Sequence, residues 1–173
     1  MAAINLGSWT HQRRRPYRDV YLTPPEILRA LGPFDLDPCA CDEPRPWPTA
    51  AVHYTFRDNG LRQPWPRQCR VWCNPPFGTA AAWLERLAAH GNGVALLFAR
   101  TETAAFVRHV WGTAGAVLFL AGRPHFYTPA GERLRGGCGG PCLLAAYGGA
   151  NVTALRNCRL PGALCERWAL TGG

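Results

Sequence analysis

The segment Asn74-Pro75-Pro76-Phe77 combines an amide, two prolines and an aromatic ring directly after the apolar run Val71-Trp72-Cys73. The side-chain oxygen of Asn74 and a nearby backbone carbonyl can each accept one N–H of an amino group. Two consecutive prolines restrict the backbone, which keeps that carbonyl in place before a substrate arrives. These two acceptors could hold a group that donates two hydrogen bonds, such as an amine. In the alternative interpretation, Pro75-Pro76 is a turn at a strand end and Phe77 packs locally.

The elements around this segment alternate between strands and helices. The pattern predicts strands at 34–37, 70–73, 94–98 and 117–120. It predicts helices at 24–31, 79–90 and 103–111, with a last short helix at 162–170. Such alternation implies a parallel sheet covered by helices, in which ligands bind at the carboxyl ends of the strands. Two groups should meet at that edge, namely Asp37-Pro38 after the first strand and Asn74 to Phe77 after the second.

Two stretches have more specific local signals. Thr23 is predicted to be the N-cap of the first helix, with Pro24 at its first position, Glu26 completing a capping box and Gly32 ending it. After Arg123 the pattern changes to a Gly-rich turn followed by the apolar run 142–147. This run is predicted to form an antiparallel hairpin that closes one edge of the sheet.

Length and charge limit the organisation and the partner. A chain of 173 residues is in the size range of one domain, so we expect a flexible basic segment at 1–19 and a single domain at 20–173. The net charge is +8, all 19 basic residues are arginine, and Arg13, Arg14 and Arg15 are consecutive. Arginine binds phosphate bidentately, which favours nucleic acid as the partner, although codon bias in a GC-rich genome would give the same composition.

The cysteines and the apolar segments bear on metal binding and location. Eight cysteines have the spacings C-x-C, C-x3-C, C-x3-C and C-x6-C, none of which is the C-x2-C pair of a zinc ribbon. We expect free thiols and no metal, with structural zinc as the alternative. No apolar run approaches the ~20 residues that span a bilayer, and the N-terminus has no signal pattern. This favours a cytoplasmic protein with no membrane partner.

Several segments together resemble the phage-type DNA N6-adenine methyltransferase (Dam) family. The similarity extends over residues 20 to 150 and is carried by Tyr21 to Leu28, Asp35 to Ala40, Asp58 to Leu61, Val71 to Gly78, Leu96 to Thr101, and Gly122 to Phe126. Asn74 to Phe77 resembles the N-P-P-[YF] motif of methyltransferases that act on amino groups. The resemblance implies a reduced Rossmann-like sheet that is mostly parallel, and transfer of a methyl group from S-adenosylmethionine to the N6 amino group of adenine in DNA.

The same resemblance implies roles for individual residues. The catalytic loop would be Asn74, Pro75, Pro76 and Phe77, with the ring of Phe77 stacked on the extruded base. The cofactor would lie against Thr23, Pro24, Asp37, Pro38 and Asp58. Each cofactor position has a simpler explanation, because Thr23 can cap a helix and Asp37 and Asp58 can form turns. The first loop also lacks the glycines that usually let the cofactor approach, so its geometry here should differ.

DNA contacts are predicted at Arg13, Arg14 and Arg15 and at Arg100 and Arg123, which follow two strands. For Arg100 and Arg123 the alternative is a surface position in a turn. The same catalytic loop also occurs in methyltransferases acting on RNA or on a protein glutamine amide. A non-catalytic, zinc-stabilised nucleic-acid-binding protein is the alternative outside the enzymes. No obligate protein partner is evident, and the resemblance places the protein in a bacterial host or phage-infected cell.

Overall fold

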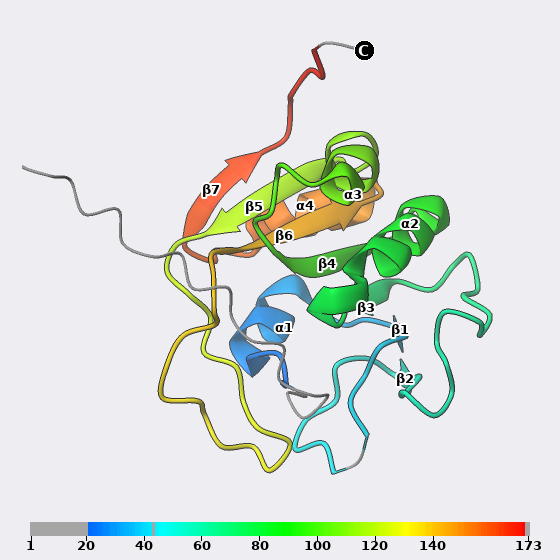
Figure 1. Ribbon diagram of the computed structural model, residues 1–173, viewed down its shortest axis with the longest axis vertical. Helices are drawn as coiled ribbons and strands as arrows, with labels where there is room; N and C mark the ends of the chain where they lie inside the picture. Colours follow the sequence, from blue (N-terminus) through cyan, green and yellow to red (C-terminus); the bar gives the residue numbers. More distant parts are fainter. Residues whose placement is uncertain (1–20, 43, 172–173) are drawn as a thin grey trace, which may run out of the picture.

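Seven strands form one continuous sheet in the order β2-β1-β3-β4-β6-β5-β7. Figure 1 shows them in the computed structural model, which describes residues 21–42 and 44–171. The parallel half contains β2 (Val52–His53), β1 (Leu36–Asp37), β3 (Val71–Cys73) and β4 (Gly93–Phe98). The carboxyl ends of these four strands therefore meet at one edge of the sheet, as the sequence predicted.

The other half of the sheet is antiparallel and corrects two expectations. Strand β6 (Cys142–Tyr147) lies between β4 and β5 (Ala116–Leu120) and is antiparallel to both. It was expected at an edge, but all six of its residues are buried, and a strand that is apolar on both faces belongs in the sheet interior. Only three of the six strand pairings are parallel, so the sheet is mixed rather than mostly parallel.

The C-terminal elements also differ from the prediction. Residues expected to form a last helix contain β7 (Gly162–Cys165), an exposed edge strand that pairs antiparallel with β5. All four of its residues pair with β5, so this segment extends the sheet instead of forming a helix. The last helix is instead α4 (Gly149–Asn157), which the sequence pattern did not reveal.

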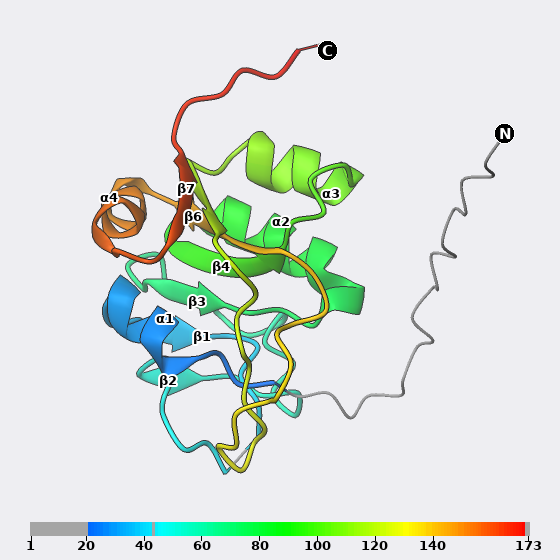
Figure 2. The same ribbon diagram turned by 90° about the vertical axis from the view of Figure 1, so that its left-hand side faces the viewer.

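Helices cover both faces of the sheet (Figure 2). Helices α1 (Pro25–Leu31) and α4 lie on one face, and α2 (Ala80–His90) and α3 (Ala104–Phe106) lie on the other. A short π-helical stretch, η2 (Val107–Trp111), continues α3. Along β4, Val94 and Leu96 contact the first layer while Ala95 and Leu97 contact the second. None of the helices in the described residues is long and apolar enough to cross a membrane.

The first helix begins one residue later than predicted. Its N-cap is Pro24 and its first residue is Pro25, and no side chain caps it. The predicted role of Thr23 as N-cap is therefore wrong, because its side chain is buried and bonded elsewhere. Gly32 does end the helix, with a positive φ of 84°.

The long connection between β5 and β6, residues 121–141, is called the β5–β6 loop below. Backbone hydrogen bonds pair its two halves, from Cys138 N to Pro124 O and from Leu134 N to Phe126 O. Its tip is anchored through Tyr127, whose backbone bonds Leu22 in both directions. The loop therefore runs as an irregular hairpin along the carboxyl edge of the sheet (Figure 2).

Candidate active site at the carboxyl edge of the sheet

Asn74 follows β3 directly and lies against the segment that precedes α1. Its Nδ2 donates a hydrogen bond to Thr23 Oγ1 at 3.3 Å. Thr23 is only 2% exposed, and its carbonyl accepts a bond from Trp47 Nε1 at 3.1 Å. The side chain and the backbone carbonyl of Thr23 are thus both held by hydrogen bonds. Because Nδ2 is engaged, the Oδ1 of Asn74 remains as an acceptor for a substrate amine.

The rest of the motif forms a rigid turn with a partly exposed aromatic ring. Pro75 is buried, Pro76 is exposed, and the Pro76 carbonyl accepts a bond from Thr79 N at 3.0 Å as the 3-10 helix η1 (Phe77–Thr79) begins. The ring of Phe77 stacks on Phe98, with centroids 3.9 Å apart, and remains 46% exposed. Local packing of Phe77 therefore occurs, and it leaves ring surface on which a base could stack.

Asp37, the last residue of β1, carries a buried carboxyl group. It is 3% exposed and accepts hydrogen bonds from Thr49 Oγ1 and from Cys39 N. Burial raises its pKa to about 6, an effect that these hydrogen bonds reduce but do not cancel. No basic residue in the described part of the chain forms an ion pair with it. The charge of Arg45, which lies beyond ion-pair distance, also lowers this pKa, as the smallest of these effects. A cationic ligand would add a second positive charge.

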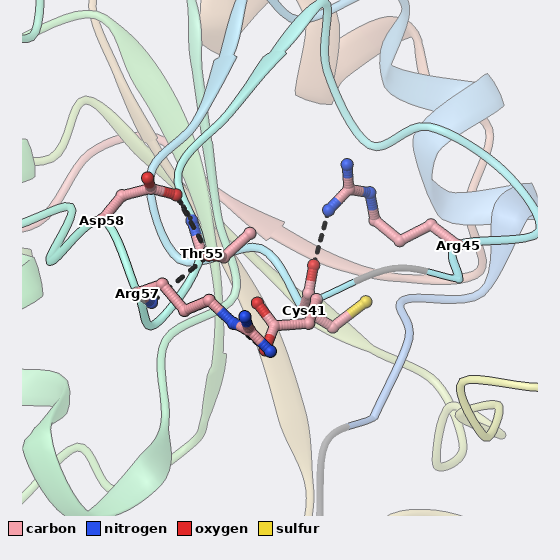
Figure 3. A network of polar contacts seen from close by, with 6 residues as sticks. Cys41, Arg45, Thr55, Arg57 and Asp58 are labelled. Carbon is pink, nitrogen blue, oxygen red and sulfur yellow. Dashed lines mark hydrogen bonds and ion pairs between the residues drawn. The ribbon is translucent and has the colours of Figure 1, made fainter.

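Asp58 lies in the exposed loop after β2 and bonds to its own turn. Its Oδ2 accepts hydrogen bonds from Thr55 N at 2.7 Å and Thr55 Oγ1 at 3.0 Å, which lower its pKa (Figure 3). The turn-forming explanation is thus realised in the structure. Contact between Asp58 and a cofactor remains a prediction.

The loop that contains Asp58 packs against the loop that contains Asp37. Tyr54 N donates to Asp37 O at 2.8 Å, and Ala40 N donates to Tyr54 O at 3.0 Å. A Cβ on Gly60 would lie 1.8 Å from the Pro38 carbonyl oxygen, so only glycine fits there. In the same region Arg57 pairs with Asp42 at 3.5 Å (Figure 3). Gly60 therefore lets the second loop pack closely against the backbone of the first.

Cys39 and Cys73 connect the predicted cofactor loop to the predicted catalytic loop, and no sequence pattern distinguished them from the other cysteines. The sulfur atoms of Cys39 and Cys73 are 3.8 Å apart, and the backbone of Asn74 hydrogen-bonds the Cys39 thiol. Burial raises the pKa of Cys39 well above its usual value, so it is a neutral thiol at physiological pH. Their position in the sequence could have identified them. Cys39 follows Asp37-Pro38 after β1, and Cys73 precedes Asn74 at the end of the neighbouring strand β3.

All eight cysteines are free, as expected. Cys138 and Cys142 form a second close pair, with sulfur atoms 3.2 Å apart. Within residues 21–42 and 44–171, no group of three or more His, Cys, Asp or Glu side chains could hold a metal ion. The zinc-stabilised alternative therefore has no ligand set in this part of the chain.

The predicted DNA-binding arginines are placed in part. Arg13, Arg14 and Arg15 lie outside the described residues. Arg100 is exposed and lines a pocket of about 230 Å³ with Phe98 and the end of the β5–β6 loop. Arg123 is exposed and lines a second pocket of about 350 Å³, which Pro24 also borders. Both pockets adjoin the motif residues, one through Phe98 under Phe77 and one through Pro24 beside Thr23.

Comparison with known proteins gives one match, to a protein family. The family model described as DNA N-6-adenine-methyltransferase (Dam) matches residues 10–138, which is most of the chain. No curated protein and no solved structure matches.

Proposed function

Since the chain belongs to the DNA N-6-adenine-methyltransferase (Dam) family, we propose that it transfers a methyl group from S-adenosylmethionine to the N6 amino group of adenine in DNA. The observation that carries the proposal at the site is the hydrogen bond from Asn74 Nδ2 to Thr23 Oγ1. In this arrangement Nδ2 is bound to Thr23, and Oδ1 is left to accept a hydrogen bond from the substrate amine. A catalytic loop for an amine needs an acceptor there, and Oδ1 is one.

The chemistry follows from the electronic state of the amine. The N6 lone pair of adenine is delocalised into the ring, so the nitrogen is a poor nucleophile. Two acceptors, Asn74 Oδ1 and a backbone carbonyl of the Pro75-Pro76 turn, would bind its two hydrogens and favour a tetrahedral nitrogen. Its lone pair would then form the new N–C bond as the C–S bond of the methyl donor breaks, with S-adenosylhomocysteine as the leaving group, and the proton lost from the nitrogen would pass to solvent. Positioning and polarisation by a preorganised loop supply the catalysis.

The residues at the edge fit the cofactor in one testable respect. S-adenosylmethionine, when bound, supplies an electrophilic methyl group on a sulfonium, and its methionine part also carries an ammonium group. The buried Asp37 carboxyl group forms no ion pair with another described residue, and Arg45 acts on it only from a greater distance, so the ammonium group could pair with it. We place the cofactor against Thr23, Pro24, Asp37 and Pro38, with Asp58 beside them, in a Rossmann-like domain spanning residues 20–173.

DNA is the substrate that the family implies, and the charge of the chain is compatible with it. The net charge of +8, all from arginine, favours a nucleic acid over a protein amide. It does not separate DNA from RNA, so RNA and protein substrates are outcomes of the test. A phage or bacterial DNA substrate would place the reaction in the cytoplasm of a bacterial or phage-infected cell.

The test is to incubate the protein with S-adenosylmethionine and unmethylated DNA and to measure methylated nucleosides by mass spectrometry. We expect N6-methyladenine, and we expect Asn74→Ala to lower its rate about 100-fold or more through loss of one acceptor. Asn157→Ala is the matched control, because Asn157 is an exposed asparagine at the end of α4. Cofactor binding without a methylated DNA base would move the search to RNA or protein. Absence of cofactor binding would contradict the proposal.

A further inference from the structure

We propose that the β5–β6 loop is a DNA-backbone-binding element, in which Arg123 and Arg133 bind a phosphate group in the pocket of about 350 Å³. The proposal takes DNA as the partner and in that respect rests on the proposed function. It concerns a different property, namely which surface of the protein contacts the nucleic acid. Three observations support it: the residues that line the pocket, the charges around it, and its position next to Thr23, which hydrogen-bonds Asn74.

The pocket lies between the two halves of the β5–β6 loop and the start of α1. Arg123 enters from the outgoing half of the loop and Arg133 from the returning half. His125 also lines the pocket, and its Nδ1 donates a hydrogen bond to Leu134 O at 3.2 Å, which ties the two halves together. Two arginines that line one concave site can bring their guanidinium groups to the oxygens of a single phosphodiester.

The charges favour an anionic ligand. The loop carries Arg123, Arg133 and Arg135 against one acid, Glu132. Glu26 is the acidic residue that lines the pocket. Among the described residues, no carboxylate forms an ion pair with any of these three arginines. Their guanidinium groups therefore keep their hydrogen-bond donors for a ligand.

The loop is held in a defined conformation. Tyr127 exchanges backbone hydrogen bonds of 2.9 and 3.1 Å with Leu22, and its ring packs edge-on against Trp47 with centroids 5.0 Å apart. The returning half is fixed at its end by Ala99 N, which donates to Pro141 O at 2.9 Å. A surface that is ordered before binding loses less conformational entropy when it takes up a ligand.

The position of the pocket connects it to the catalytic loop. Pro24 borders the pocket, and the adjacent Thr23 hydrogen-bonds Asn74. On the other side of the loop, Gly139 to Pro141 border the pocket that contains Arg100 and Phe98. A DNA strand whose phosphate is bound by Arg123 and Arg133 would thus lie next to the residues that hold the target base.

The experiment measures binding of a fluorescent DNA duplex of mixed sequence by anisotropy, without S-adenosylmethionine, over a series of salt concentrations. We expect Arg123→Gln/Arg133→Gln to bind about tenfold more weakly and to lower the slope of log K against log salt by about 1, because both arginines bind the same phosphate. The matched control is Arg67→Gln/Arg108→Gln, which removes the same charge. Arg67 precedes β3 at the opposite edge, Arg108 lies on η2, and both are exposed.

Three outcomes would overturn the proposal: unchanged binding in the loop variant, an equal loss in both variants, or a wild-type protein that binds no duplex. Melting temperatures of the variants, measured alongside, show that each is folded. The proposed function is tested separately by the nucleoside assay. Loop-dependent DNA binding without methylation would contradict only the proposed function, and methylation without loop-dependent binding would contradict only this inference.

Discussion

At the residue scale, the orientation of Asn74 depends on a residue 51 positions earlier in the chain. The Thr23 hydroxyl is buried and accepts a hydrogen bond from Asn74 Nδ2, which holds the amide in one orientation. The hydroxyl could also donate to Oδ1 of a rotated amide. A rotated amide would present N–H groups to the substrate amine, which is itself a donor. The hydroxyl of Thr23 is therefore a positioning group for the acceptor oxygen, and it need not touch the substrate to affect the rate.

Replacing Thr23 by valine tests this positioning role. Thr23→Val keeps the shape of the side chain and removes the oxygen, so we expect kcat for methyl transfer to fall about tenfold, the equivalent of ~1.4 kcal/mol. Thr23→Ser keeps an oxygen and should retain a rate near that of the wild type. The measurement is steady-state kinetics of all three proteins. A normal kcat in Thr23→Val, or an equal loss in Thr23→Ser, would show that the hydroxyl does not orient the amide.

At the element scale, the loops after β1 and β2 behave as one unit. Backbone bonds join Tyr54 to Asp37 and to Ala40, and Gly60 touches the Pro38 carbonyl. Trp65 Nε1 donates to Gly60 O at 3.0 Å and holds the second loop from its other side. The position of Asp37-Pro38 thus depends on Gly60, which is not among the residues predicted to contact the cofactor.

A methyl group at Gly60 should separate these two loops. In Gly60→Ala the new Cβ would lie 1.8 Å from Pro38 O, so the backbone must move. We expect a loss of about 1 to 3 kcal/mol in the free energy of unfolding, as for other overpacked sites, together with weaker S-adenosylmethionine binding. Urea denaturation and calorimetric titration would measure the two effects. Gly149→Ala is the control, because nothing lies within 4 Å of its added Cβ. If both variants kept wild-type stability, the contact would have no structural role.

Elements with strong local signals were predictable from the sequence. The helix predicted at 79–90 is α2 (Ala80–His90), and it ends at Gly91, whose φ is 75°. Thr103 caps α3, because its side chain accepts a hydrogen bond from Phe106 N. Both features are short-range patterns. The place of β6 in the sheet was not predictable in the same way, because it depends on pairing with β4, nearly fifty residues earlier, and on burial of both its faces. Strand β7 also depends on a distant partner, β5.

The same distinction between short-range and long-range signals applies to the candidate site. The motif Asn74 to Phe77 and the acid Asp37 could be identified from residue types at strand ends, and the parallel strands place them at one edge. The contact between Thr23 and Asn74 could not, because the capping pattern gave Thr23 a plausible local role. Its side chain bonds Asn74, which is distant in the sequence, instead of capping α1, and only the three-dimensional structure shows this contact.

At the scale of the whole molecule, one sheet with helices on both faces should unfold as a single cooperative unit. The cost of burying an ionised group in this unit then contributes to the global free energy of unfolding. Asp37 is such a group, since it is 3% exposed and burial raises its pKa from 3.8 to about 6. Below pH 3.8 both the folded and the unfolded chain hold this proton, while between the two values mainly the folded chain does.

The sign of the pH dependence follows. Because the folded state binds the proton more tightly, the stabilising contribution is fully present below pH 3.8 and is lost as pH rises through about 6. The expected loss is about 3 kcal/mol, from a difference of about two pKa units at 1.36 kcal/mol each. The measurement is urea denaturation of the wild type and Asp37→Asn between about pH 4 and about pH 7, in which the variant should lack this decline.

Asp58→Asn is the control for this measurement, because the pKa of Asp58 is lowered rather than raised and its loss should leave the decline in place. Saturating S-adenosylmethionine adds a second arm. A cation beside Asp37 favours the ionised carboxylate, so the ligand should stabilise the wild type more at pH 7 than at pH 5, and Asp37→Asn should lose this difference. An identical pH dependence in wild type and Asp37→Asn would show that the buried carboxyl group is not linked to folding. A ligand effect that is independent of pH would place the cation of the cofactor away from Asp37.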